Sequence, residues 1–326
     1  MKKRLLLCTF LLMMGYSLAG RAACSISPTS VNASLGTVTS FVLNTTPSTV
    51  STTITVNCGS GLVVLLSSDF VSVQLVGATP NAGGRGELAL NSNDIPIQLC
   101  STSNCSTELT IGGTATTYSQ SQLINLANLL GGFVFPIPLY IRTLPNAVVP
   151  AGTYTGQLSV LFTYRICTGI GLFGACLLGQ QQTGTFTVPI NVTITITNDC
   201  TTITAPTINF GSAPLVSSFL PVNQSISVIC TKGSTYTVGL NYGLHATGHQ
   251  RYMTSGGNQL AYQIYQGSGP DDWGDNGSAR VPSSASNAIS SDQLTRTFNY
   301  TALILTSQNT PAAGSYSDTV TVDLSF

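Results

Sequence analysis

The residues of this chain that could do chemistry are its cysteines and its two histidines. The sequence of 326 residues contains nine cysteines and two histidines. No two cysteines have the C-x-x-C spacing that is typical of a zinc site. His245 and His249 lie in a glycine-rich stretch where no helix is expected to place both rings on one face. We therefore expect no metal site and assign the cysteines to disulfide chemistry.

Eight of the cysteines follow the first two dozen residues, an even set that suits an oxidising compartment. Two pairs are close neighbours, Cys100–Cys105 and Cys167–Cys176. The other four frame two similar stretches, Cys24–Cys58 and Cys200–Cys230. We expect four disulfides with these partners. Each would contribute about 2–4 kcal/mol, with more from the longer loops.

The sequence contains none of the common catalytic motifs. There is no G-x-S-x-G, no H-E-x-x-H, no P-loop and no G-x-G-x-x-G after a predicted strand. Residues 271–277 resemble a calcium loop, but they lack the Asp at the third position and the distal Glu. We expect a protein that is not an enzyme, with no catalytic residues and no cofactor.

The composition excludes several classes of protein. Eleven basic residues balance eleven acidic ones, and only 7% of the chain is charged, against about a quarter in a typical soluble domain. Its 43% of hydrophobic residues is too many for a disordered chain. Beyond the first two dozen positions, no stretch has the ~18–20 consecutive apolar residues of a spanning helix. The neutral balance argues against nucleic acid as a partner.

The first 22 residues are typical of a signal peptide. Lys2–Arg4 form a positively charged start, and Leu5–Met14 form an apolar segment of the right length. Cleavage after Ala22 satisfies the preference for small residues. The alternative is a lipoprotein cleaved just before Cys24, which Arg21 disfavours because Leu is usual at that position.

The chain contains an internal duplication. Cys24–Asn32 matches Cys200–Asn209, and the clearest match joins Pro150–Tyr164 to Ala313–Phe326. These segments alternate apolar and polar residues and are bounded by Gly, Pro, Asn or Ser, which is the pattern of half-buried strands. Several such strands in each copy predict an all-β protein of two immunoglobulin-like β-sandwich domains.

The two copies end differently. After Tyr164 the first copy continues into a strong strand pattern at Thr185–Ile196, whereas the second copy stops at Phe326. We expect the C-terminal domain to be incomplete, lacking its last strand. An unpaired edge recruits another chain or aggregates, so a partner would supply the strand by β-augmentation. The alternative is a second domain that pairs differently and is complete by itself.

Three features together resemble the spore coat protein U family. They are the paired cysteine frames, the Trp273-Gly-Asp-Asn-Gly segment after Leu260–Tyr265, and the terminal segment Ala313–Phe326. Secreted members of that family are subunits of archaic (Csu-type) chaperone–usher pili. The resemblance implies a periplasmic chaperone, an outer-membrane usher and the next pilin subunit as partners, and export through the periplasm to the cell surface.

As a member with two such domains, this chain resembles the tip adhesin of such pili. We expect no donor strand before Cys24, so this subunit would only accept a strand, which places it at the pilus tip. The predicted division is a signal peptide at 1–22, an N-terminal adhesin domain at 23–198 and a C-terminal pilin domain at 199–326. The predicted function is attachment to abiotic hydrophobic or host surfaces, promoting biofilm formation.

Three apolar, glycine-bounded segments of the first copy are candidates for the surface-binding site. Connections in a sandwich are normally polar, and three apolar ones at one pole would form a binding patch. For 62–66 and 133–135, a buried strand is the alternative. The candidate contact residues are Leu62, Val63, Val64, Leu65, Leu66, Leu129, Leu130, Phe133, Val134, Phe135, Ile170, Leu172, Phe173, Leu177 and Leu178.

Two other function classes stay open. A lectin-like adhesin would need a polar pocket with a Trp or Tyr at the pole of the first domain, and Trp273, the single Trp, belongs to the second domain. A structural shaft or coat subunit would be expected to carry an extension before Cys24.

Overall fold

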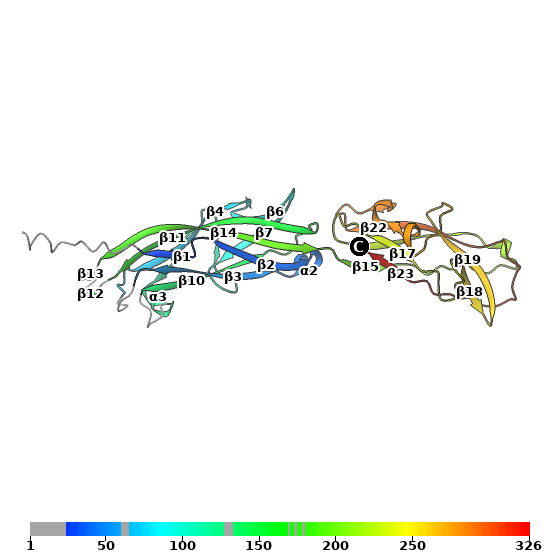
Figure 1. The fold of residues 1–326 in the computed structure, drawn as a ribbon, viewed down its shortest axis with the longest axis horizontal. Coiled ribbons are helices and arrows are strands. Elements are labelled where there is room, and N and C mark those ends of the chain that lie inside the picture. Colours follow the sequence, from blue (N-terminus) through cyan, green and yellow to red (C-terminus); the bar gives the residue numbers. More distant parts are fainter. Residues whose placement is uncertain (1–23, 60–64, 127–132, 169, 173–174, 178–179) are drawn as a thin grey trace, which may run out of the picture.

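The alternation of apolar and polar residues produces strands that bury every second side chain. The computed structural model describes residues 24–59, 65–126, 133–168, 170–172, 175–177 and 180–326. The predicted signal peptide lies outside them. The chain is all-β and forms two β-rich domains joined end to end (Figure 1). Within the described residues, no helix is long and apolar enough to cross a bilayer.

The first domain is a sandwich built from one continuous sheet, with two short helices. Its sheet order is β1-β3-β10-β7-β6-β11-β14-β2, and β4 pairs with β11. The elements are β1 (Ser25–Ser27), β2 (Val31–Thr39), α2 (Ser40–Thr45), β3 (Thr49–Asn57), β4 (Phe70–Thr79), β5 (Asn81–Ala82), β6 (Arg85–Leu90), β7 (Asn93–Cys100), β8 (Glu108–Leu109), β9 (Thr116–Ser119), α3 (Gln120–Leu126), β10 (Val134–Thr143), β11 (Gly152–Cys167), β12 (Ile170–Leu172), β13 (Ala175–Leu177) and β14 (Gln181–Thr197).

The second domain repeats this order with two separate sheets, β15-β16-β22-β19-β18 and β20-β17-β23. Its elements are β15 (Cys200–Thr204), η1 (Val216–Ser218), β16 (Val222–Cys230), β17 (Thr237–Leu240), β18 (Arg251–Ser255), β19 (Asn258–Gln266), η2 (Gly277–Ala279), β20 (Val281–Pro282), η3 (Ser283–Ala285), β21 (Ala288–Ile289), β22 (Thr295–Ile304) and β23 (Val322–Ser325). By strand order, β15, β16, β22 and β19 correspond to β1, β3, β10 and β7, and the pair β17–β23 corresponds to β4–β11.

Each domain has its own hydrophobic core. The first core draws its buried residues from Cys24 to Ile196, and the second from Val216 to Ile304. The four disulfides have the expected partners, and Cys24–Cys58 and Cys200–Cys230 occupy equivalent places in the two domains. Sheets and cores thus divide in the same region as the predicted boundary, although the boundary at residue 198 itself stays a prediction.

Candidate functional site

The second domain leaves open a place that a strand fills in the first. In the first domain, β14 lies between β2 and β11, parallel to β2 and antiparallel to β11. By strand order and sequence repeat, residues 207–214 correspond to β2, and residues 312–325, which end in β23, correspond to β11. Between these two segments lies a groove of about 710 Å³.

The same backbone kink marks the two corresponding segments. Gly36 in β2 has φ 83° and Gly211 has φ 76°, the left-handed region that favours glycine. Each glycine N–H donates to a side chain two residues earlier, to Ser34 Oγ at 3.2 Å and to Asn209 Oδ1 at 2.9 Å. The matching geometry supports the equivalence of residues 207–214 and β2.

One wall of the groove has free backbone groups. Within the described part of the chain, residues 206–214 form no backbone–backbone hydrogen bond, whereas β2 pairs with β14 over most of its length. Ile208, Phe210 and Phe219 are half-buried and pack against the second core. An edge that combines free backbone groups with apolar side chains can accept an added strand.

Strand β14 indicates what a strand in this groove must look like. Its side chains at Val188, Ile190, Val192, Ile194 and Ile196 are 0–2% exposed. The residues between them are half-buried on the opposite face. Because successive side chains of a strand alternate between faces, a strand with an apolar residue at every second position would fill the groove of the second domain in the same way.

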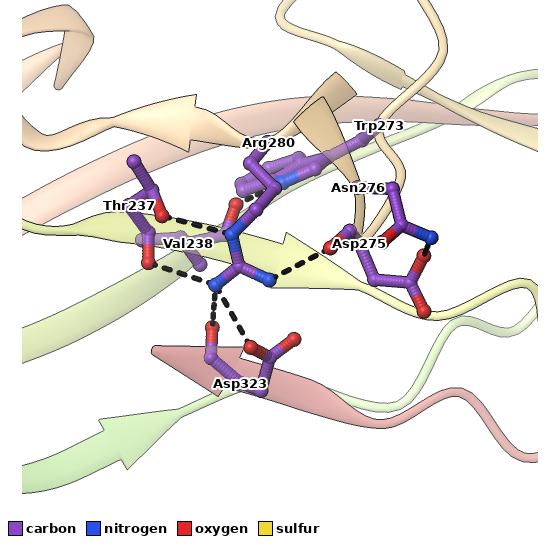
Figure 2. Close-up of polar contacts among 7 residues, drawn as sticks. All are labelled: Thr237, Val238, Trp273, Asp275, Asn276, Arg280 and Asp323. Atoms are coloured by element: carbon purple, nitrogen blue, oxygen red, sulfur yellow. Dashed lines mark hydrogen bonds and ion pairs between the residues drawn. The ribbon is translucent and has the colours of Figure 1, made fainter. Parts of the chain in front are cut away.

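A polar cluster fixes β23, which continues the other wall of the groove (Figure 2). The fully buried Trp273 donates its indole N–H to the Val238 carbonyl oxygen at 2.9 Å. Arg280 Nε donates to the Thr237 hydroxyl oxygen at 2.8 Å, and Arg280 Nη2 lies 2.8 Å from the Asp323 carboxylate. Since Thr237 and Val238 belong to β17, the cluster joins the segment after β19 to both β17 and β23.

Two glycines leave room for this cluster. A Cβ on Gly274 would collide with the Tyr242 hydroxyl, and a Cβ on Gly239 would collide with the Arg280 guanidinium. The Trp-Gly pair of the sequence therefore has a packing reason, because the residue after Trp273 must be small.

A buried arginine ties together the other end of β17. Arg251 is fully buried, and its guanidinium donates to the carbonyl oxygens of Asn241 at 2.8 Å, Leu240 at 2.9 Å and Trp273 at 2.6 Å. It also lies 4.7 Å from the centre of the Tyr242 ring. Burial lowers the pKa of Arg251. Sequence reasoning missed this residue, because nothing in its type or spacing indicates burial.

A carboxylate holds the segment that precedes β23. The Asp318 carboxylate accepts the Tyr262 hydroxyl at 2.7 Å and the Leu244 N–H at 2.9 Å. Burial is the main cause that raises the pKa of Tyr262, and the hydrogen bond to Asp318 raises it further. The segment 312–325, of which residues 312–316 line the groove, is thus attached to β19 and to the loop after β17.

The far end of the first domain only partly matches its predicted role. Leu65, Leu66, Phe133 and Phe135 are buried, at 4%, 6%, 2% and 0% exposure, so their assignment to an exposed contact surface is wrong. Phe133 exchanges backbone hydrogen bonds with Cys58 and Gly59, the two residues that follow β3, which continues the β3–β10 pairing. The alternation of a paired strand then turns Phe133 and Phe135 into the core and leaves Val134 half-buried.

The third predicted segment forms a hairpin. β12 pairs with β13, with Ile170 opposite Leu177 and Leu172 opposite Ala175. The Cys167–Cys176 disulfide joins β13 to the end of β11. Figure 1 places this hairpin at the end of the first domain that lies away from the second. The remaining candidates lie outside the described residues: Leu62, Val63, Val64, Leu129, Leu130, Phe173 and Leu178.

A buried carboxylate joins the bases of these segments. Asp69 is 1% exposed and accepts the backbone N–H of Leu66 at 2.9 Å, the backbone N–H of Cys167 at 3.2 Å and the side-chain amide of Gln181 at 3.2 Å. The Gln120 amide, on α3, donates to the Leu65 carbonyl oxygen at 2.6 Å. The structure thus brings the bases of the predicted segments together. In the sequence, the signal for this contact is a single acidic residue, Asp69, close to the apolar run at 62–66.

The described residues contain no group of three or more His, Cys, Asp or Glu side chains that could hold a metal ion. His249 stacks on Tyr242, with ring centroids 4.8 Å apart. The histidine therefore has a packing contact in the loop after β17.

The comparisons with known proteins agree with the duplicated architecture. The family model for the Spore Coat Protein U domain matches residues 11–161 and 186–323, which together make up most of the chain. The chain belongs to the Spore Coat Protein U domain family. The matched ranges omit residues 162–185, which contain the β12–β13 hairpin. The hairpin is therefore additional to the part of the domain that the family model describes.

A solved structure shares the fold of this Spore Coat Protein U domain protein. It is similar to the CsuC–CsuE chaperone–tip adhesion subunit pre-assembly complex of Acinetobacter baumannii archaic chaperone–usher Csu pili, at 22% identity, covering 93% of this chain and 100% of that one, with TM-score 0.56. The CupB6 tip adhesin of Pseudomonas aeruginosa is 12% identical, with 92% and 94% covered and TM-score 0.38. No curated protein sequence matches the chain.

Proposed function

We propose that this protein is the tip adhesin subunit of a chaperone–usher pilus. The observation that carries the proposal is the groove of the second domain, at the place that β14 fills in the first. A strand from a periplasmic chaperone, and later from the next pilin subunit, would bind there. By the pattern of β14, the subunit's strand would run parallel to residues 207–214 and antiparallel to residues 312–325.

The use of β14 supports a position at the tip. In the first domain, this strand pairs with β2 and β11 of its own domain, and its apolar side chains are buried there. It is therefore not free to complete another subunit. A subunit that accepts a strand and donates none would end the fibre, after export through the periplasm and an outer-membrane usher.

The attachment site we propose is the far end of the first domain, centred on the hairpin. The strands of the hairpin contain the apolar residues Ile170, Leu172 and Leu177. Burial of one Leu or Phe side chain contributes about 1.5–3 kcal/mol. A few such contacts would hold one subunit weakly to an abiotic hydrophobic or host surface. Many pili would add avidity and promote biofilm formation.

The groove is tested by exchanging one of its apolar residues. Ile208→Asp places a charge beside the expected donor strand, and we expect the full chain to lose its complex with the chaperone of its pilus system and to disappear from the cell surface. Val76→Asp is the matched control, because Val76 is an exposed valine of the first domain, at 42%. Normal chaperone binding and export of Ile208→Asp would contradict the groove assignment.

The hairpin is tested on pili that assemble. Leu172→Glu should leave the amount of surface pili unchanged and reduce attachment of the cells to plastic. Undiminished attachment would contradict the hairpin as contact site without affecting the groove assignment.

A further inference from the structure

The contact between the two domains suggests how the next subunit is seated. At the junction, Ser40 Oγ of α2 and Thr231 Oγ1, which follows β16, form a buried hydrogen bond of 2.7 Å. Phe41 of α2 and Leu294 line the same narrow gap between the domains. The end of the first domain that carries α2, between β2 and β3, is therefore packed against the end of the second domain that carries Thr231 and Leu294. Two domains of the same family thus meet through opposite ends.

The second domain has the equivalent of this α2 end. The helix η1 lies between residues 207–214 and β16, just as α2 lies between β2 and β3. β16 has nine residues and ends beside Thr231 at the junction. At about 3.3 Å per residue, its start lies about 30 Å from the junction. The η1 end therefore forms the far end of the second domain, next to the groove.

This far end exposes large apolar side chains. Leu215 is 53% exposed and Leu220 is 78% exposed, on either side of η1. Leu215 also lines the groove, so the exposed surface is continuous with the site of strand addition. In the first domain the equivalent end is packed against a second family domain.

We propose that the surface formed by Leu215, η1 and Leu220 is a docking site for the next subunit, separate from the donor-strand contact. The proposal rests on the proposed function. The occupant is another Spore Coat Protein U domain. It contacts this surface with the end that carries its equivalent of Cys230. We expect this end to carry the same contacts as the junction between the two domains. The residue after the equivalent of Cys230 would have a small hydroxyl side chain, as Thr231 does, and the residue equivalent to Leu294 would be apolar. The donor strand ties the subunits together, and this contact sets their orientation.

The test uses the full chain in pili assembled and shed by cells, after the chaperone has left. The photo-crosslinking residue p-benzoylphenylalanine replaces Leu220 in one variant and Leu244 in the control. Leu244 is 71% exposed and belongs to the loop after β17. After irradiation, the cross-linked peptides are sequenced by mass spectrometry. We expect the residue at position 220 to cross-link to a pilin subunit within a few residues of that subunit's equivalent of Cys230. We expect position 244 to give several-fold less of that product.

Each outcome decides one question. If pili contain the chain but position 220 gives no such product, or cross-links to another part of the subunit, the docking site is contradicted. The donor-strand groove is not affected by that result. Absence of the chain from all pili overturns the proposed function and the docking site with it. As a second measurement, Leu220→Glu should leave chaperone binding unchanged and lower the amount of this chain per pilus. An unchanged amount contradicts the docking site.

Discussion

The two domains of this protein are built from the same strand order, yet one closes its sandwich and the other leaves it open. In the first domain, β14 supplies five apolar side chains to the core and pairs with strands on both of its sides. In the second, the corresponding place is a groove beside an unpaired segment. The presence or absence of one strand turns the same fold from a closed domain into one that can accept a partner.

The open domain compensates with polar contacts between side chains and backbone. The pair β11–β4 extends over nine residues of β11, whereas the corresponding β23–β17 pair has only four. In the second domain Arg280 attaches this shorter strand to β17, and Asp318 attaches the segment before it to β19. Arg251 joins the end of β17 to the segment after β19. These contacts hold β17, β23 and the segment before β23 together where backbone pairing is short.

The largest effect is expected from breaking the closed domain. Ile190→Asp puts a carboxylate into the first core and removes a buried side chain, which should lower the free energy of unfolding of that domain by more than about 4 kcal/mol. Calorimetry of the full chain would follow the two domains. Thr193→Asp, on the opposite face of β14, is the control and should have a much smaller effect. If Ile190→Asp leaves the unfolding of the first domain unchanged, β14 is not what closes it.

An intermediate effect is expected from the polar contacts of the open domain. Arg251→Met keeps most of the side-chain volume but leaves the carbonyl oxygens of Leu240, Asn241 and Trp273 without their donor. We expect a loss of about 3–5 kcal/mol in the free energy of unfolding of the second domain. Denaturant unfolding would measure it. The exposed Arg165 of the first domain provides the control Arg165→Met, expected within about 0.5 kcal/mol of the unmodified chain. Equal effects of both variants would contradict the structural role of Arg251.

The smallest effect concerns the far end of the first domain. Asp69→Asn preserves shape but replaces a carboxylate acceptor with an amide donor, so at least one of its three hydrogen bonds is lost. We expect a loss of about 1–2 kcal/mol, together with faster amide hydrogen exchange at Leu66 and Cys167. The exposed Asp94 provides the control Asp94→Asn, with no change in exchange at those two amides. Unchanged exchange in Asp69→Asn would show that the carboxylate does not organise this end.

Much of the fold could be predicted because it depends on local and periodic features. Strand patterns such as Pro150–Tyr164 repeat in the two copies, and strand alternation depends only on a period of two. Two cysteine pairs follow from their close spacing, and the other two follow from the matched frames of the two copies. The prediction for Leu65, Leu66, Phe133 and Phe135 was wrong for a physical reason: an apolar run reads the same whether it is an exposed loop or a paired strand facing a core.

The sequence by itself determined the all-β class, the duplication and the cysteine partners, because these depend on periodicity, on spacing and on comparing one copy with the other. Only the tertiary structure decided that residues 207–214 are unpaired beside a groove, that Arg251 and Asp69 are buried, and that β12–β13 stands at the far end of the first domain. Those facts depend on which segments meet in space. An arginine or aspartate has the same side chain in water as in a core, and only its neighbours decide what it does.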